Sequence, residues 1–118
     1  MDELISMALR RPVEMSDFAF QGDPSPEEVR AVCDRFACRL IEHYLSGSLT
    51  WVQADTAANH IYLLMVRDCG DRVPDYAWDV YLAFDAGEHA APGGDATTRP
   101  LIERIVTQYG PSPEPTDK

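Results

Sequence analysis

Apolar residues recur at helical spacing between residues 26 and 45, and this stretch is the clearest element in the chain. Ser25 and Glu28 fit a capping box, and Pro26 occupies the first helical position. Gly47 is placed to end the helix. One face of the predicted helix carries the apolar residues that recur every three or four positions: Val29, Val32, Cys33, Phe36, Leu40, Ile41 and Tyr44.

A second capping box, Thr50 with Gln53, predicts a helix that continues to Gly70. Residues 61–66 in its second half are apolar without interruption. A helix that is apolar on all sides is normally buried. We therefore expect this helix to lie at the centre of the fold, with the other helices packed on it.

Residues 75–87 fit two periods. Trp78, Val80, Leu82 and Phe84 alternate with other residues, which is typical of a strand. Acidic residues in the first turn and Gly87 at the end favour a helix. We predict a helix here. The alternative is an α+β fold in which residues 60–67 and 77–85 form a hairpin.

The remaining elements are shorter. Asp2 can start a helix through about Arg11, and the segment 13–23 is expected to place Phe18 and Phe20 on the core. The last helix is predicted to start at Thr98 or Arg99, with Pro100 in its first turn. Residues 111–118 form a polar, Pro-rich tail that we expect to be disordered.

These elements predict an all-α fold: a single compact domain over residues 1–110, with four or five helices around a central apolar helix. The length of 118 residues suits one domain. The side chains expected in its core are Phe36, Leu40, Ile61, Met65, Val80 and Phe84.

The chain is acidic, with a formal net charge of −10. This balance argues against nucleic acid and anionic membranes as partners, because phosphate binding needs clustered Lys and Arg. No apolar run reaches the ~20 residues that cross a bilayer. The three cysteines show no zinc or disulfide pattern, and the first residues lack the features of a signal peptide. We therefore expect reduced thiols, a cytoplasmic protein and a basic protein partner.

Aromatic and acidic residues are interleaved in the segment 75–85, and this combination suits binding to a basic protein surface. We expect no catalytic residue, metal or other cofactor. The residues predicted to bind the partner are Asp75, Trp78, Asp79, Tyr81 and Asp85.

In size and charge the chain resembles small acidic helical proteins that neutralise basic toxins, such as bacterial immunity proteins and antitoxins, but no motif carries the resemblance and no family is assigned from it. The acidic charge and the interleaved aromatic residues lead us to expect a non-enzymatic binding module, of the inhibitor or immunity type.

Two other functions remain open. Asp85, Glu88 and His89 could hold a divalent ion in a small metal-dependent hydrolase. The structural interpretation of the same residues is that Glu88 and His89 are exposed loop residues and that Asp85 binds a backbone group or an Arg, for which Arg72 and Arg99 are the candidates. A helical homodimer is the third possibility.

Overall fold

The computed structural model describes residues 1–110, and this part of the chain contains helices and no strand. The all-α prediction is confirmed, and the alternative hairpin of residues 60–67 and 77–85 is wrong. The tail predicted over residues 111–118 lies outside the described residues. The elements within residues 1–110 are α1 (Asp2–Ala8), the 3₁₀ helix η1 (Met15–Asp17), α2 (Pro26–Leu45), α3 (Trp51–His60), α4 (Tyr62–Arg67), α5 (Asp75–His89) and α6 (Asp95–Tyr109).

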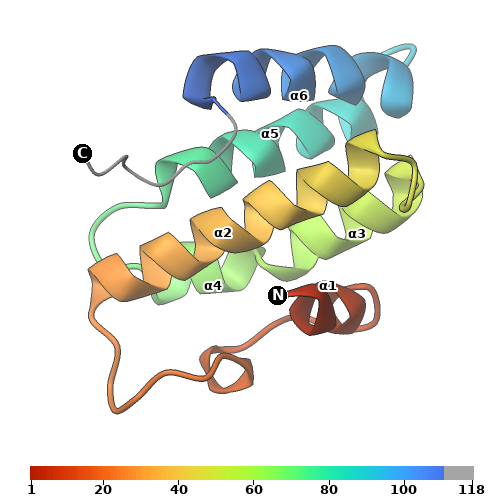
Figure 1. The fold of residues 1–118 in the computed structure, drawn as a ribbon. Helices are drawn as coiled ribbons and strands as arrows, with labels where there is room; N and C mark the ends of the chain where they lie inside the picture. Colours follow the sequence, from red (N-terminus) through yellow and green to blue (C-terminus); the bar gives the residue numbers. More distant parts are fainter. Residues whose placement is uncertain (111–118) are drawn as a thin grey trace.

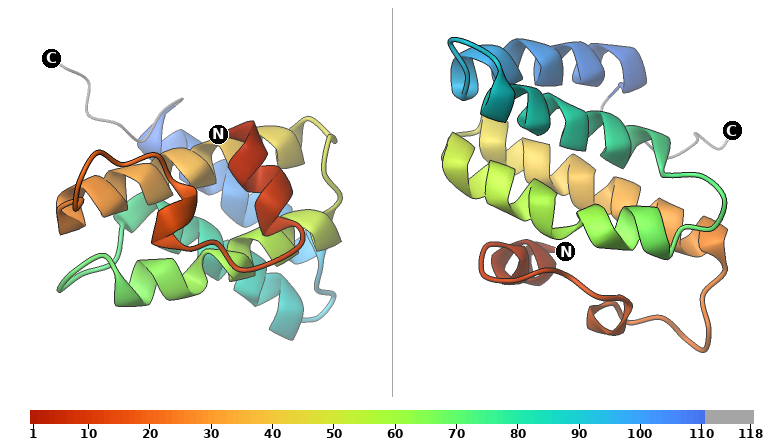
Figure 2. Two further views of the ribbon diagram at one scale, coloured as in Figure 1. Left: turned by 90° about the horizontal axis from the view of Figure 1, so that it is seen from below. Right: turned by 180° about the vertical axis from the view of Figure 1, so that it is seen from behind.

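The helices form one compact domain (Figure 1). Helix α5 packs against α2, α3 and α6, and α1 packs against α2 and α3. The right-hand view in Figure 2 shows α3 and α4 following one another along one side of α5, with α6 along the other side. This arrangement brings surface residues of α4 and α5 onto one face of the molecule.

Both predicted capping boxes are present. The Ser25 hydroxyl accepts a hydrogen bond from the Glu28 backbone at 3.1 Å, and the Glu28 carboxylate accepts one from the Ser25 backbone at 2.7 Å. Thr50 and Gln53 exchange the same two bonds at the start of α3. These local contacts fix the starts of α2 and α3 because each box needs only four consecutive residues.

The helix predicted from Thr50 to Gly70 is interrupted at Ile61, which separates α3 from α4. The backbone N–H of Val13 donates to the His60 carbonyl at 2.9 Å. In an uninterrupted helix that carbonyl would accept from Leu64. The His60 ring also donates from Nδ1 to the Ala8 carbonyl at 2.6 Å. The N-terminal segment is therefore bonded to the point at which the helix breaks.

The first half of this predicted helix is central, as expected, because α3 contacts α1, α2 and α5. The second half differs from the expectation. In α4, Leu64 and Met65 are buried, whereas Leu63 and Val66 are 48% and 42% exposed. No other helix of the described domain covers that side of α4, so an apolar run without interruption is only half buried.

The six predicted core side chains are all buried, and so are Cys33, Cys69 and Phe18. Phe20 packs against this core, as predicted, with its ring centroid 5.8 Å from that of Phe18. The core therefore draws on α2, α4 and α5, together with the segment that precedes α2.

The junction of α5 and α6 differs from the prediction. Helix α5 continues through Gly87 to His89, and α6 starts at Asp95, so Pro100 lies inside the helix and not in its first turn. Gly87 is buried, and a Cβ built on it would lie 2.4 Å from the Thr98 hydroxyl oxygen. Gly87 thus permits close helix packing and does not end the helix.

The start of α5 lacks a cap from its own N-cap residue, Pro74. Instead, the Asp34 carboxylate on α2 accepts a hydrogen bond from the Ala77 backbone N–H at 2.9 Å. Burial raises the pKa of Asp34 to about 6, although this backbone bond favours its charged form. A residue far away in the sequence therefore satisfies the first turn of α5.

Candidate functional site

Three aromatic rings gather where α4 meets α5. The centroid of the Tyr62 ring lies 6.0 Å from that of Trp78 and 5.0 Å from that of Tyr81, and the Trp78 and Tyr81 centroids are 5.2 Å apart. These spacings are those of attractive aromatic pairs. Each side chain is only half buried, so the cluster presents aromatic surface to solvent.

Exposed apolar side chains continue this surface on both helices. Leu82 is 43% exposed and lies one helical turn after Trp78 on α5, at the edge of this surface, where it also lines a groove between α5 and α6. On α4, Val66 lies one turn after Tyr62, next to Leu63. We call this surface the aromatic face. It consists of Tyr62, Leu63, Val66, Trp78, Tyr81 and Leu82.

A group of carboxylates lies at one end of the aromatic face, towards the last turn of α5. Asn59 on α3 donates to Glu88 on α5 through a hydrogen bond of 2.7 Å. The carboxyl group of Asp55, one turn earlier on α3, hydrogen-bonds to Glu88. Asp85, four residues after Tyr81, lies close enough for its charge to raise the pKa of Asp55. We call Asp55, Asp85 and Glu88 the acidic cluster.

The pKa values of Asp55 and Glu88 are shifted in opposite directions. Burial, and then the hydrogen bond and the charge of Glu88, raise the pKa of Asp55 to about 7. The hydrogen bonds that Glu88 receives from Asp55 and Asn59 lower the pKa of Glu88. The Oδ1 atom of Asp55 is buried and receives no hydrogen bond from a donor group of the described residues. When Asp55 is protonated, its carboxyl group can donate to Glu88, and one proton then serves both groups.

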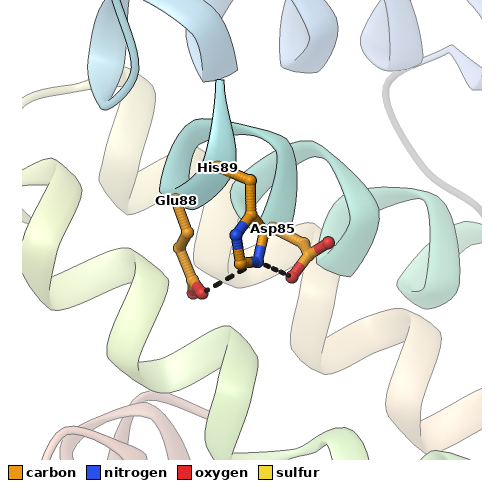
Figure 3. Close-up of side chains that lie close together, drawn as sticks. All are labelled: Asp85, Glu88 and His89. Atoms are coloured by element: carbon orange, nitrogen blue, oxygen red, sulfur yellow. Dashed lines mark ion pairs between the residues drawn. The ribbon is translucent and has the colours of Figure 1, made fainter. Parts of the chain in front are cut away.

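His89 is placed beside the acidic cluster by the last turn of α5. Its Nε2 atom lies 3.3 Å from an Asp85 oxygen and 3.9 Å from a Glu88 oxygen, and Figure 3 shows the ring between the two carboxylates. The predicted pairing of Asp85 with Arg72 or Arg99 is wrong. Arg99 pairs with Asp95, four residues earlier on α6.

Asp85, Glu88 and His89 could contact one metal ion, because one ligand atom from each lies within 4.8 Å of the others. All three come from the end of one helix, and Glu88 and His89 are exposed. Glu88 is already engaged by Asn59. Asn59 donates to Oε2 of Glu88, whereas Oε1 of Glu88 is the atom that lies nearest His89, so this hydrogen bond orients the carboxylate without occupying its second oxygen.

The five residues predicted to bind a partner do not all lie free on one face. Asp75, Trp78 and Asp85 share the outer stripe of α5, spaced three and seven residues apart. Tyr81 borders this stripe on the side of α4. Asp79 lies on the side of α6, where it accepts a hydrogen bond from the Tyr109 hydroxyl at 2.8 Å. Asp79 thus has a structural contact within the domain.

The acidic cluster differs in its partners from carboxylates such as Asp2 and Asp17. Asp2 pairs with Arg39 and Asp17 pairs with Arg11, and these contacts lower the pKa of both carboxylates. Within residues 1–110, no arginine forms an ion pair with Asp55, Asp85 or Glu88. The acidic end of the aromatic face therefore has no arginine partner within the described residues, and its carboxylates contact Asn59 and His89.

Several residues of this site were missed in the sequence analysis. Residues 61–66 were expected to be buried, so Tyr62, Leu63 and Val66 were not among the predicted binding residues. The signal was present, since a short helix that is apolar on every side can also have one side with no partner inside the domain. Asp55 and Asn59 gave no signal, because only the packing of α3 on α5 brings them to Glu88.

Comparisons with protein-family models, with curated proteins and with solved structures find no match to this chain. Within residues 1–110, none of the helices has the length and apolar character needed to cross a membrane.

Proposed function

We propose that this protein is a non-enzymatic binding module that engages a basic protein, in the manner of an inhibitor or immunity-type protein. It binds through the aromatic face and the acidic cluster. The expected cytoplasmic location belongs to the same proposal. Asp79 is no longer among the binding residues, whereas Tyr62, Leu63, Val66, Leu82, Asp55 and Glu88 join Asp75, Trp78, Tyr81 and Asp85.

One observation carries the proposal: partly exposed aromatic rings at the rim of the core and exposed apolar side chains adjoin carboxylates that have no arginine partner within the described residues. Aromatic side chains supply binding energy at protein interfaces. Uncompensated carboxylates select basic partners and speed their approach. An excess charge of −10 on the chain acts in the same direction.

The test is capture of partners from a lysate of the source cells at low and high salt, with wild-type protein, Trp78→Ala and a control variant. Glu103→Gln is the control, because Glu103 is exposed on α6 and its charge acts on Tyr44, away from α4. We expect wild type and Glu103→Gln to retain a basic protein that salt releases and that Trp78→Ala fails to hold. An acidic partner, or retention that ignores salt, would contradict the proposal.

A metal-dependent hydrolase is the second candidate, and it rests on the three ligand atoms of Asp85, Glu88 and His89. The two proposals differ in one measurable property. A hydrolase needs a bound divalent ion, whereas the binding module should retain its partner unchanged in the presence of a chelator.

A further inference from the structure

We propose that the aromatic face binds one basic segment of a protein partner, with the apolar side chains of the segment on α4 and its Arg or Lys side chains at the acidic cluster. The inference rests on the proposed function and adds to it the position, the direction and the chemistry of the bound segment.

The direction follows from the antiparallel course of α3–α4 and α5. Tyr62 contacts Trp78 and Tyr81 in the first half of α5, whereas Asn59 contacts Glu88 near its end. The exposed apolar residues of α4 follow Tyr62 in the chain, so they lie towards the start of α5. The acidic cluster lies towards its end. The surface is therefore apolar towards the start of α5 and acidic towards its end.

The spacing sets what the segment must look like. Trp78 and Asp85 are seven residues apart on α5, which is about 10 Å at 1.5 Å per residue. A partner helix whose apolar residues precede its basic residues by two turns spans this length, and so does an extended segment of three or four residues.

The basic end of the segment would meet an aromatic ring and carboxylates together. Tyr81 supplies a partly exposed ring, and the carboxylates of Asp85 and Glu88 lie close enough for their charges to act on it. A guanidinium over an aromatic ring and beside a carboxylate gains from both contacts. The domain already uses this arrangement elsewhere, because the guanidinium of Arg99 lies 4.8 Å from the centre of the Tyr44 ring and pairs with Asp95.

A second copy of the chain is a poor occupant of the same surface. Each copy carries a charge of −10, so a contact between two copies through the aromatic face would bring two strongly acidic molecules together. Like charges at a contact cost free energy that the apolar residues would have to offset. Charge complementarity therefore favours a basic segment over a homodimer.

The experiment uses the full chain and a synthetic peptide of the length of α5, with Leu residues in its first half and Arg residues in its second. Two control peptides replace Arg by Glu or Leu by Ser. Binding is measured by calorimetry at low salt, and the contact surface by changes in backbone amide shifts. We expect saturable binding of the Leu–Arg peptide, with shifts confined to α3, α4 and α5, and weaker binding of both control peptides.

Variants of the protein test the two ends separately. Trp78→Ala should weaken binding at least about tenfold, since aromatic anchors commonly carry more than 1.4 kcal/mol. Trp78→Phe keeps a ring and should recover most of the affinity. Asp85→Asn should weaken binding and flatten its salt dependence, whereas Glu103→Gln should change neither. Circular dichroism of each variant shows whether the fold is retained.

Four outcomes would overturn the inference: no binding of the Leu–Arg peptide, equal binding of the Leu–Glu peptide, shifts on α1 or α6 alone, or equal affinity of Trp78→Ala and wild type with both folded. A dimer of the free protein that the peptide does not dissociate would also overturn it, in favour of a second copy. If a basic partner from the lysate binds elsewhere, the surface is wrong while the proposed function stands. If that partner is acidic, both fail.

Discussion

Replacing Asp55 by Asn should stabilise the protein above neutral pH. The Asp55 carboxyl group holds a proton in the folded state because it is partly buried and bonded to Glu88, and its pKa is raised to about 7. A carboxyl group whose pKa is higher in the folded state stabilises the fold below its unfolded pKa. That contribution is lost as the pH rises through the folded value. Asn keeps the hydrogen bond to Glu88 at every pH, because its amide donates.

The magnitude follows from the difference between the two pKa values. The pKa of Asp55 rises from 3.8 to about 7, and one pH unit corresponds to about 1.4 kcal/mol. The largest possible loss of wild-type stability between these values is therefore ~4 kcal/mol. The lowered pKa of Glu88 offsets part of it. Water screens another part, since Asp55 is not fully buried, so we expect a gain of about 1–2 kcal/mol in Asp55→Asn at about pH 8.

The assay is urea unfolding followed by circular dichroism, at about pH 4.5 and about pH 8, with the free energy of unfolding extrapolated to water. The control is Asp71→Asn, which removes the same charge from an exposed loop position. It measures how much stability is gained simply by lowering the net negative charge of the protein. Asp55→Asn should exceed this control at the higher pH and match it at the lower one. Some pH dependence should persist, because the pKa of Asp34 is also raised, to about 6.

Two results would refute this reasoning. One is a lower stability of Asp55→Asn than of wild type at about pH 8. The other is the same gain at both pH values. Either result would mean that Asp55 and Glu88 do not share a proton in the folded protein.

Three further predictions concern the core, the helix contact and metal binding. Leu40→Ala should lower the free energy of unfolding by about 2–5 kcal/mol, and a loss below about 1 kcal/mol would contradict the assigned core. Gly87→Ala should destabilise by about 1–2 kcal/mol in the same assay, because its Cβ meets Thr98 and Trp51 and this clash outweighs the higher helix propensity of Ala. A variant as stable as wild type would show that Thr98 and Trp51 move to make room for the added Cβ atom. Calorimetry should detect no tight zinc or manganese binding, and a stoichiometric site that His89→Ala abolishes would overturn this.

The elements that could be predicted from the sequence are those set by neighbouring residues. Ser25 with Glu28, and Thr50 with Gln53, fix two helix starts within four positions each, and both boxes are present. The interruption at Ile61 could not be predicted in this way, because the carbonyl before it bonds to the backbone of Val13, which is far away in the sequence. The cap that Asp34 provides for α5 is equally non-local.

The candidate site shows the same division. The stripe of Asp75, Trp78 and Asp85 follows from helical spacing alone. The second half of the site comes from α3 and α4, and its position depends on how they pack against α5. Helical spacing alone does not predict the role of Asp79. This residue lies at the edge of the stripe, and its carboxylate accepts a hydrogen bond from Tyr109 on α6.

The bond between Val13 and His60 couples the N-terminal segment to the aromatic face mechanically. Ile61, the residue at the break, directly precedes Tyr62, which joins α4 to Trp78 and Tyr81. Loss of the first thirteen residues would remove this bond, and the His60 carbonyl would then be free to accept from Leu64 as in a continuous helix. A cleavage or a tight contact near the N-terminus would therefore affect the backbone next to Tyr62, on a surface formed by a different part of the chain.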